Sequence, residues 1–492
     1  MKWRTVTKSD KAEYKSFTKW IGLIGITNII TSLSQFIILP ILTKSMSIEN
    51  YGIWIQASVT ISLLSSIFTL GLPYTMVRYM ASEKNIKKIQ ENFYSIVYIV
   101  LVASSIVSLV IILFSKQLAD LVFDGNIFIT QILSIIIILA CLNNIIINYF
   151  RTFHQIVKYC IMTLLSTYVG IIIEATLLFL GYGLNGVLIG LLTSQILVFL
   201  IMFIYIIKDI GVIVPKFINI KEFLSFGLPT VPGNVSSWII NVSDRYIIGI
   251  FLGIAYVGYY SPGYTLGGII NTIAAPIFFM LPSILSRYYD NNDMDNVKRV
   301  LYYSMKYFLI IAVPATIGIT LLSRQILEFL TTEDIALNGY LITPFITVSM
   351  LLYGIRSINS QILILEKKTK ITGFVWSLAA IVNLILNIIF IPYIGLIGAA
   401  ISTLIAYAIA FIIIEYYSNK YIQLNKDWKL LAKVCIASVA MSLVLIAWQP
   451  VGLVNILLVV LVCVILYFII LFMLGTFKEY EINFFRELVL RK

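Results

Sequence analysis

LPYTMVRY at residues 72–79 recurs as LPSILSRY at residues 281–288, so that both copies read Leu-Pro-x4-Arg-Tyr. The sequence on either side of these copies also aligns with itself. Three further matches keep nearly the same offset, namely 28–35 on 234–241, Gly52 on Gly258, and the Gly-Leu-x-Gly of 183–186 on that of 395–398. Four matches in order, at offsets that drift only from 206 to 212, indicate an internal duplication.

Both copies consist mainly of long apolar segments. Hydrophobic residues make up 60% of the chain and charged residues only 12%, against roughly a quarter charged in an average soluble domain. About 20 apolar residues cross a bilayer as a helix, the form in which a single segment satisfies its own backbone hydrogen bonds in lipid. We find fourteen such segments, near 18–42, 52–80, 92–114, 127–150, 160–180, 186–207, 223–252, 257–283, 300–323, 341–365, 371–391, 396–415, 430–448 and 452–475.

The duplication sets the expected arrangement of these segments. Each copy holds six spans, an even number, so both copies enter the membrane from the same side and form a parallel repeat. We therefore predict an all-α integral membrane protein of about 14 transmembrane helices, with two six-helix lobes and two extra C-terminal helices. The predicted parts are an N-terminal arm (1–17), an N-lobe (18–220), a C-lobe (221–420), two further spans (421–475) and a C-terminal tail (476–492).

The charges between the spans predict the topology. Lys and Arg fall in the loops that would be cytoplasmic if the N-terminus is inside, as the positive-inside bias requires. The arm and the tail are then both cytoplasmic, and the net charge of +12 reflects topology and not nucleic-acid binding. We find neither a phosphate-binding glycine loop nor a metalloprotease or nucleophile-elbow motif. The sequence therefore predicts neither an enzyme nor a bound cofactor or metal.

Asp244 and Arg245 stand inside an apolar run, WIINVSDRYIIGIFLG, at residues 238–253. A charge at the bilayer centre costs roughly 2.5–3.5 kcal/mol on insertion scales, so it usually faces a protein interior or water and marks function. Polar residues at helical steps share a face with the pair, and the first copy repeats that face without the charges. The two predicted cavity-lining stripes are Asn234, Ser237 and Asn241 in the second copy, and Asn28, Thr31 and Gln35 in the first.

Four other charges complete the predicted site. Arg356 lies near the middle of the tenth span with Asn359 on the same face, and Glu174 lies within the fifth. Arg78 and Arg287 lie at the inner ends of their spans, where they either reach the cavity or extend to the interface. Adjacent residues on a helix point about 100° apart, so a pair between Asp244 and Arg245 cannot be assumed. Asp244 could instead pair with Arg356 or with another lobe. Glu174 is either the partner of an arginine or a proton or cation site.

These side chains favour an anionic cargo. Guanidinium groups hold phosphate in a bidentate manner without losing charge. A carboxylate in the same cavity could carry a coupling proton, since desolvation disfavours its charged form. Tyrosine and asparagine side chains suit a sugar. The choice between H⁺ and Na⁺ as a coupling ion stays open.

Three segments resemble a known family. NIITSLSQFIILPILTKSMSIENYGIW (28–54), SDRYIIGIFLGIAYVGYYSPGYTLGGII (243–270) and NLILNIIFIPYIGLIGAAISTLIAYAI (383–409) are similar to polysaccharide transporters of the multidrug/oligosaccharidyl-lipid/polysaccharide (MOP) superfamily. The resemblance implies a MATE-like fold and a Wzx-type flippase. Such proteins move undecaprenyl-pyrophosphate-linked oligosaccharides across the prokaryotic cytoplasmic membrane for O-antigen, capsule or exopolysaccharide assembly. Asp244 and Arg245 would then lie in a cationic lumen, to which Arg356 adds.

Alternatives remain within and outside this superfamily. A cation-coupled multidrug exporter has the same fold, but it is expected to have an acidic lumen. A lipid II flippase would carry more arginine in the first lobe. A membrane polysaccharide polymerase or ligase would need a large outer loop with catalytic charge. For the flippase, the expected partners are the lipid-linked oligosaccharide and membrane lipids, together with glycosyltransferases and a polymerase of the same pathway.

Overall fold

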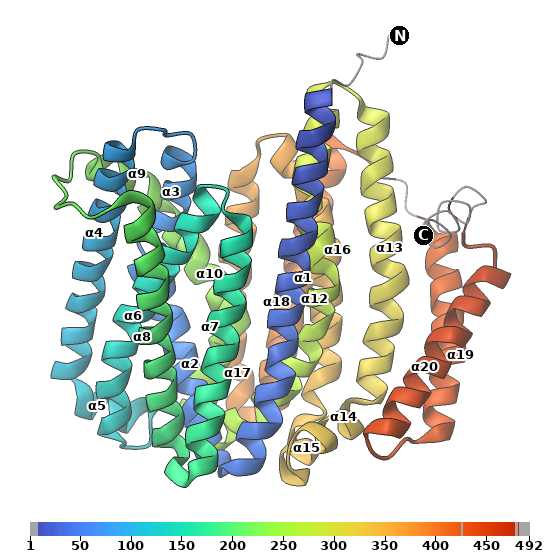
Figure 1. Cartoon of the computed structure of the whole chain (residues 1–492). Coiled ribbons are helices and arrows are strands. Elements are labelled where there is room, and N and C mark those ends of the chain that lie inside the picture. Colours follow the sequence, from blue (N-terminus) through green and yellow to red (C-terminus); the bar gives the residue numbers. More distant parts are fainter. Residues whose placement is uncertain (1–7, 425–426, 478–480, 482–492) are drawn as a thin grey trace. The chain divides into compact units, whose positions relative to one another are not determined.

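The protein is helical throughout the part of the chain that its structure covers. A computed structural model describes residues 8–424, 427–477 and 481, and these residues form helices and no β-strand (Figure 1). The predicted all-α membrane fold is thereby confirmed. Most of the predicted arm lies at the start of the first helix, whereas residues 1–7 and nearly all of the predicted tail lie outside the described residues.

Within the described residues, twelve helices are long and apolar enough to cross a membrane. The protein is therefore a multi-pass membrane protein. These helices are formed by α1 (Lys8–Ser45), α2 (Ile48–Phe68), α4 (Ile86–Leu113), α6 (Ile127–Thr152), α7 (Ile156–Leu177) joined to α8 (Gly183–Ile210), α12 (Ile254–Asp290), α13 (Met294–Leu321), α16 (Ile342–Leu365), α17 (Thr369–Ile394), α18 (Leu396–Tyr421), α19 (Trp428–Trp448) and α20 (Leu453–Met473). The predicted count of fourteen is thus approximate.

The difference in count has two local causes. The first is that α7 and α8 are counted together as one span, Ile156–Ile210. The two helices are in fact separated by a kink, because Gly181 has φ 88° inside the π-helical turn η1 (Leu178–Tyr182), and they pack against each other. The seventh predicted span is not a single helix. It consists of α9 (Ile220–Gly227), a 3₁₀ turn (Leu228–Thr230), α10 (Val231–Val242) and α11 (Asp244–Leu252). Pro229 and Pro232 lack the backbone N–H that a continuous helix needs.

The second predicted span is likewise divided, and further short helices lie between the long ones. After α2, Leu70 and Gly71 take positive φ values of 54° and 67°, which end the helix before α3 (Leu72–Met80) begins with Pro73 in its first turn. Three more short helices are α5 (Ser115–Val122), α14 (Ser323–Leu330) and α15 (Glu333–Gly339). Apolar composition predicted the long helices, whereas some of the breaks within the predicted spans occur at glycine and proline.

The chain divides into two compact units. The first comprises Met1–Ser261 with Trp376–Ser402, and the second comprises Pro262–Val375 with Thr403–Lys492. Helices α12, α17 and α18 contribute to both units. The lobe boundaries at residues 220 and 420 stay a prediction.

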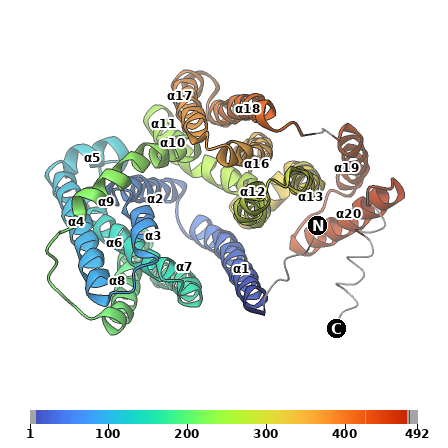
Figure 2. The ribbon, with the colours of Figure 1, turned by 90° about the horizontal axis from the view of Figure 1, so that it is seen from above.

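In the first unit, α6 is the central helix. It packs against α2, α3, α4 and α8, and α7 packs along α8 (Figures 1 and 2). The core is aromatic at one end of α6, where the ring of Tyr149 lies 5.2 Å from that of Phe93 and 4.7 Å from that of Phe153. Burying a large side chain stabilises by about 1.5–3 kcal/mol relative to water. These contacts give the unit a rigid bundle on which its polar residues are placed.

In the second unit, α13 is flanked by α16 and by the C-terminal helices. Helix α19 packs against both α13 and α20, and the hydroxyl of Tyr467 in α20 donates to the carbonyl of Ile310 in α13 over 2.7 Å. The Lys306 ammonium of α13 forms an ion pair of 2.8 Å with Glu481, and both side chains are buried. Glu481, which follows the last apolar helix in sequence, therefore contacts α13.

The glycines that match between the two sequence copies meet in the first unit. A Cβ atom on Gly52 would collide with the carbonyl oxygen of Ile254 and lie 3.4 Å from the backbone nitrogen of Gly258. A Cβ atom on Gly258 would lie 2.8 Å from the carbonyl oxygen of Ile48. The start of α2 and the start of α12 thus pack backbone to backbone.

We expect Gly52→Ala to lower the free energy of unfolding by about 1–3 kcal/mol, the usual cost of overpacking. The backbone of α12 would have to move away from α2 to admit the methyl group. SDS titration of the purified protein in mixed micelles measures the change. Gly373→Ala is the matched control, since no atom lies within 4 Å of its added Cβ. Equal stability of the two variants would show that this contact tolerates a side chain.

Candidate functional site

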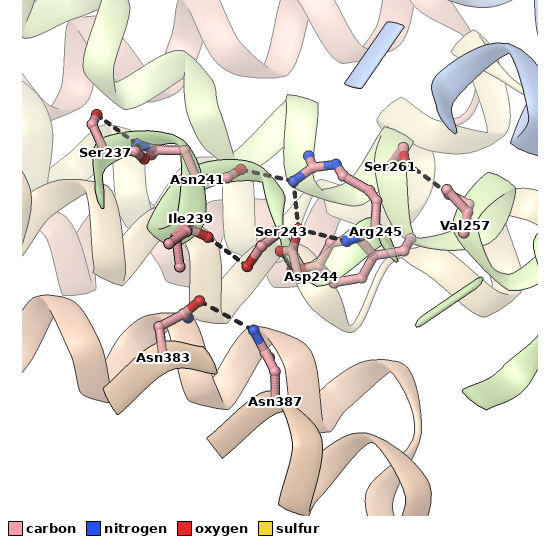
Figure 3. Close-up of polar contacts among 11 residues, drawn as sticks. Ser237, Ile239, Asn241, Ser243, Asp244, Arg245, Val257, Ser261, Asn383 and Asn387 are labelled. Atoms are coloured by element: carbon pink, nitrogen blue, oxygen red, sulfur yellow. Dashed lines mark hydrogen bonds and ion pairs between the residues drawn. The ribbon is translucent and has the colours of Figure 1, made fainter. Parts of the chain in front are cut away.

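Asp244 and Arg245 form an ion pair at the start of α11. The Arg245 Nη1 donates to Asp244 Oδ1 over 2.8 Å, and the backbone N–H of Arg245 donates to the same oxygen over 2.9 Å (Figure 3). The hydroxyl of Tyr260 donates to the other carboxylate oxygen over 2.5 Å. Asp244 is 1% exposed and Arg245 is 7% exposed. Both oxygens of this carboxylate are therefore occupied in a site from which water is nearly excluded.

The rest of Arg245 is held within the same unit. Its Nη1 also donates to the carbonyl of Asn241 over 2.7 Å, and its guanidinium carbon lies 5.5 Å from the ring centroid of Tyr260. A hydrogen bond of 2.5 Å joins the next residue, Tyr246, to Thr60 of α2. The sequence left open whether Asp244 pairs elsewhere, and the structure gives Arg245 as its partner. The predicted role of Arg245 in the lumen stays a prediction.

The two predicted polar stripes differ in exposure. In α1, Asn28 and Gln35 are exposed and Thr31 is half-buried; in α10, Asn234, Ser237 and Asn241 are half-buried. The stripe on α10 is held internally, since the Asn241 amide donates to the Ser237 carbonyl over 2.7 Å. The hydroxyl of Tyr74 in α3 donates to Asn234 over 3.3 Å. Lining of a common cavity by both stripes remains a prediction.

Arg356 lies in the second unit, among aromatic side chains. It is 3% exposed, and its guanidinium carbon lies 5.8 Å from the ring centroid of Tyr353. That ring in turn lies 5.7 Å from the ring of Tyr407 in α18. A guanidinium over an aromatic face is stabilised by the ring quadrupole. Helix α16 thus carries a buried cation in the middle of a membrane-spanning segment, as its sequence position predicts.

The remaining predicted charges occupy different surroundings. Arg78 near the end of α3 and Arg287 near the end of α12 are both exposed, so the choice between a cavity role and an interfacial one stays open. Glu174 in α7 is 6% exposed. Asn359 donates its side-chain amide to Glu415 of α18, and Asn419 donates to the other oxygen of that carboxylate over 3.0 Å.

The comparison with family models identifies the chain. Residues 41–335, more than half of the sequence, match the family described as polysaccharide biosynthesis protein. This chain belongs to that family. The same match covers both members of the Asp244–Arg245 pair and Glu174, whereas Arg356 lies beyond its end.

Curated relatives of this polysaccharide biosynthesis protein are distant in sequence. It is 20% identical over 241 residues to the probable low-salt glycan biosynthesis flippase Agl15 of Haloferax volcanii. The aligned region covers 49% of this chain and 51% of that protein. The probable flippase AglR of the same organism is 22% identical, covering 57% of this chain and 60% of that protein. An uncharacterised membrane protein of Methanocaldococcus jannaschii, MJ1068, is 23% identical over 86% of this chain and 88% of its own length. This chain thus spans about half the length of the first relative.

Solved structures confirm the expected fold of this polysaccharide biosynthesis protein. The lipid II flippase MurJ in an inward closed conformation superposes with a TM-score of 0.73, at 20% identity, over 96% of this chain and 99% of that one. A MATE family multidrug resistance transporter of the MOP superfamily superposes with a TM-score of 0.63, at 15% identity, over 81% and 98% of the two chains. The predicted MATE-like fold is therefore confirmed.

Several polar residues of this family member are not indicated by any of the sequence patterns above. Asn383 and Asn387 are fully buried in α17, where the amide of Asn387 donates to the Asn383 side chain over 3.1 Å (Figure 3). The four-residue spacing in NLILN could have drawn attention to them. Glu415 is the last residue of the predicted span 396–415, and no sequence pattern distinguishes it from a residue at the membrane interface. No local pattern links Lys306 to Glu481, which is far along the chain.

Proposed function

We propose that this protein flips an undecaprenyl-pyrophosphate-linked oligosaccharide across a prokaryotic cytoplasmic membrane by alternating access, for the export of a polysaccharide. In this proposal both termini are cytoplasmic, and the protein acts as a transporter and not as an enzyme. Glycosyltransferases and a polymerase of the same pathway supply and consume its cargo. Membership of the polysaccharide biosynthesis family supports the pathway, and the names of the two Haloferax volcanii relatives support flipping.

The observation that carries the proposal is the buried guanidinium of Arg356. A cation at this depth is costly unless it serves a partner or a ligand. Guanidinium groups bind phosphate oxygens with two parallel hydrogen bonds. Arg356 would therefore hold the pyrophosphate, and Tyr353 offers a ring on which a sugar could stack. Coupling of this step to H⁺ or to Na⁺ forms part of the proposal.

The main competing function is export of organic cations, because multidrug transporters share the fold. A site for such cargo needs anionic side chains. Here Asp244 is already neutralised by Arg245, and the oxygens of Glu415 accept hydrogen bonds from two asparagines. These contacts favour the anionic cargo.

Transport by reconstituted protein separates the two functions. We expect proteoliposomes to move a fluorescent undecaprenyl-pyrophosphate oligosaccharide between leaflets, well above the rate in protein-free vesicles, and to leave ethidium outside. Reductive quenching of the outer leaflet measures the first movement, and ethidium fluorescence on trapped DNA measures the second. Ethidium uptake without lipid movement would replace the proposed function with drug export.

A further inference from the structure

Glu174 is an isolated acid in a long apolar part of the chain. It is the only charged residue between Lys158 and Lys208. Its side chain is buried in α7, four residues before the π-helical turn that leads to α8. Neither the Asp244–Arg245 pair nor the Asn359–Glu415 contact involves it. The function proposed above therefore leaves this carboxyl group unexplained.

The carboxyl group lies where α7 and α8 touch. A Cβ atom on Gly190 of α8 would lie 3.0 Å from both the backbone nitrogen and the Cα of Glu174, so the two helix backbones are in close contact. A Cβ atom on Gly170, one turn earlier in α7, would lie 3.6 Å from Glu174 Oε1 and equally far from Ser194 Oγ. The carboxyl group thus lies beside Gly170, and the hydroxyl of Ser194 lies close to the same glycine. Among the described residues, none forms a hydrogen bond or an ion pair with its carboxyl group.

Among the described side chains, no charged group on the helices around α7 forms an ion pair with Glu174. Helix α7 packs against α1, α6, α8 and η1. The acid nearest to Glu174 in sequence is Asp209, which pairs with Lys158 over 3.6 Å. Lys158 lies near the opposite end of α7, and the 16 residues from Lys158 to Glu174 correspond to about 24 Å along the helix. Among the residues whose side chains the structure describes, the other titratable groups on these elements are Lys44 of α1, Cys141, Tyr149 and Arg151 of α6, Tyr159, Cys160 and Tyr168 of α7, Tyr182 of η1, and Tyr205 and Lys208 of α8.

We propose that Glu174 is a proton-binding site, protonated while α7 packs on α8 and ionised when water reaches that contact. An ionised carboxylate without a compensating charge costs several kcal/mol inside a membrane, whereas the neutral acid avoids this cost. Binding adds one H⁺ to the carboxylate and gives the acid, whose O–H can donate to a neighbouring oxygen. A hard metal ion would take six or more oxygen ligands, and the described neighbours provide one carboxyl group and one hydroxyl.

Proton binding at Glu174 stands independently of the cargo, whereas its use in transport rests on the proposed function. In the transport cycle, hydration of the contact between α7 and α8 would release the proton to one side of the membrane. Repacking of the two helices would require a proton to return. Each cycle would then carry one H⁺ through unit 1, with the anionic cargo held elsewhere in the chain.

Infrared spectroscopy of the full protein in nanodiscs tests the site directly. At neutral pH we expect a carbonyl stretch from a protonated carboxylic acid, which shifts in D₂O and disappears in Glu174→Gln. The matched control is Glu328→Gln, which removes an exposed carboxylate paired with Arg324 over 2.8 Å and should leave the band unchanged. Absence of the band from the wild type, or its persistence in Glu174→Gln, would overturn the proposal.

Thermal unfolding of the same samples separates a proton site from a structural ion pair. A folded state that keeps Glu174 neutral binds more protons than the unfolded state, so the stability of the wild type must fall as pH rises. Glu174→Gln keeps the shape and hydrogen-bonding groups of the neutral acid, and we expect it to lose this component of the pH dependence. If the variant were instead less stable by the same amount at every pH, Glu174 would serve a cation and the proposal would fail.

Flipping assays then address the use of the proton in transport. We expect a pH gradient to accelerate wild-type flipping, and Glu174→Gln to flip at a rate that the gradient no longer changes. An infrared band without any lipid movement by the wild type would keep the proton site and remove the flippase function. A gradient response that survives in Glu174→Gln would remove Glu174 from the coupling step.

Discussion

Asp244→Ala is expected to lower the free energy of unfolding by about 3–5 kcal/mol, the cost of leaving a buried charge without its partner. Arg245 would keep its hydrogen bond to the Asn241 carbonyl and its position near the Tyr260 ring, but both contacts lack a compensating charge. Tyr260 would lose its acceptor as well. Unfolding by SDS titration measures the change, with wild type and variant starting from mixed micelles of the same composition.

Two further variants distinguish a buried ion pair from a general effect of lost charge. Replacing both partners, as in Asp244→Leu with Arg245→Met, should recover most of the loss, because apolar side chains of similar volume need no compensation. Glu328→Gln removes one partner of the exposed Arg324–Glu328 pair and should change stability by no more than about 0.5 kcal/mol. A single variant at Asp244 that unfolds like the wild type would mean that Arg245 has other charge compensation.

The helix boundaries illustrate what the sequence could and could not predict. Long apolar runs predicted most of the membrane-crossing helices, because lipid leaves the backbone no other way to satisfy its polar groups in a single span. The interruptions at Leu70 and at Pro229 were missed, since each depends on a few local dihedral angles within an apolar stretch. Hydrophobicity alone does not record such breaks.

Pairing within the site was harder to predict than the position of its charges. Neighbouring side chains diverge on a helix, yet the long Arg245 side chain turns back so that its Nη1 reaches Asp244. Tyr260 completes the pair from the next helix, after a break at Gly253 with φ 103°. Contacts of this kind depend on side-chain rotamers and on helix packing, which a single sequence does not specify.

Arg356→Gln is expected to slow flipping of the pyrophosphate-linked oligosaccharide by roughly 100-fold. Truncating one partner of a buried, hydrogen-bonded charge pair costs about 2–5 kcal/mol, and tenfold in rate corresponds to about 1.36 kcal/mol. Glutamine retains hydrogen-bonding capacity but neither the charge nor the fork that matches two phosphate oxygens. Arg356→Lys keeps the charge without the fork and should fall between the wild type and Arg356→Gln. The fluorescent-lipid assay in proteoliposomes measures all three.

The design of this experiment depends on separating transport from folding. Arg324→Gln is the matched control, because Arg324 is exposed and lies in α14, away from the aromatic cluster around Arg356; it should flip lipid at the wild-type rate. Stability of each variant is measured by SDS titration on the same preparations. A stable Arg356→Gln that flips as fast as the wild type would exclude Arg356 as the pyrophosphate ligand. Slow flipping together with unchanged stability would locate cargo binding at the cation of α16, because only the interaction with the anion has then been lost.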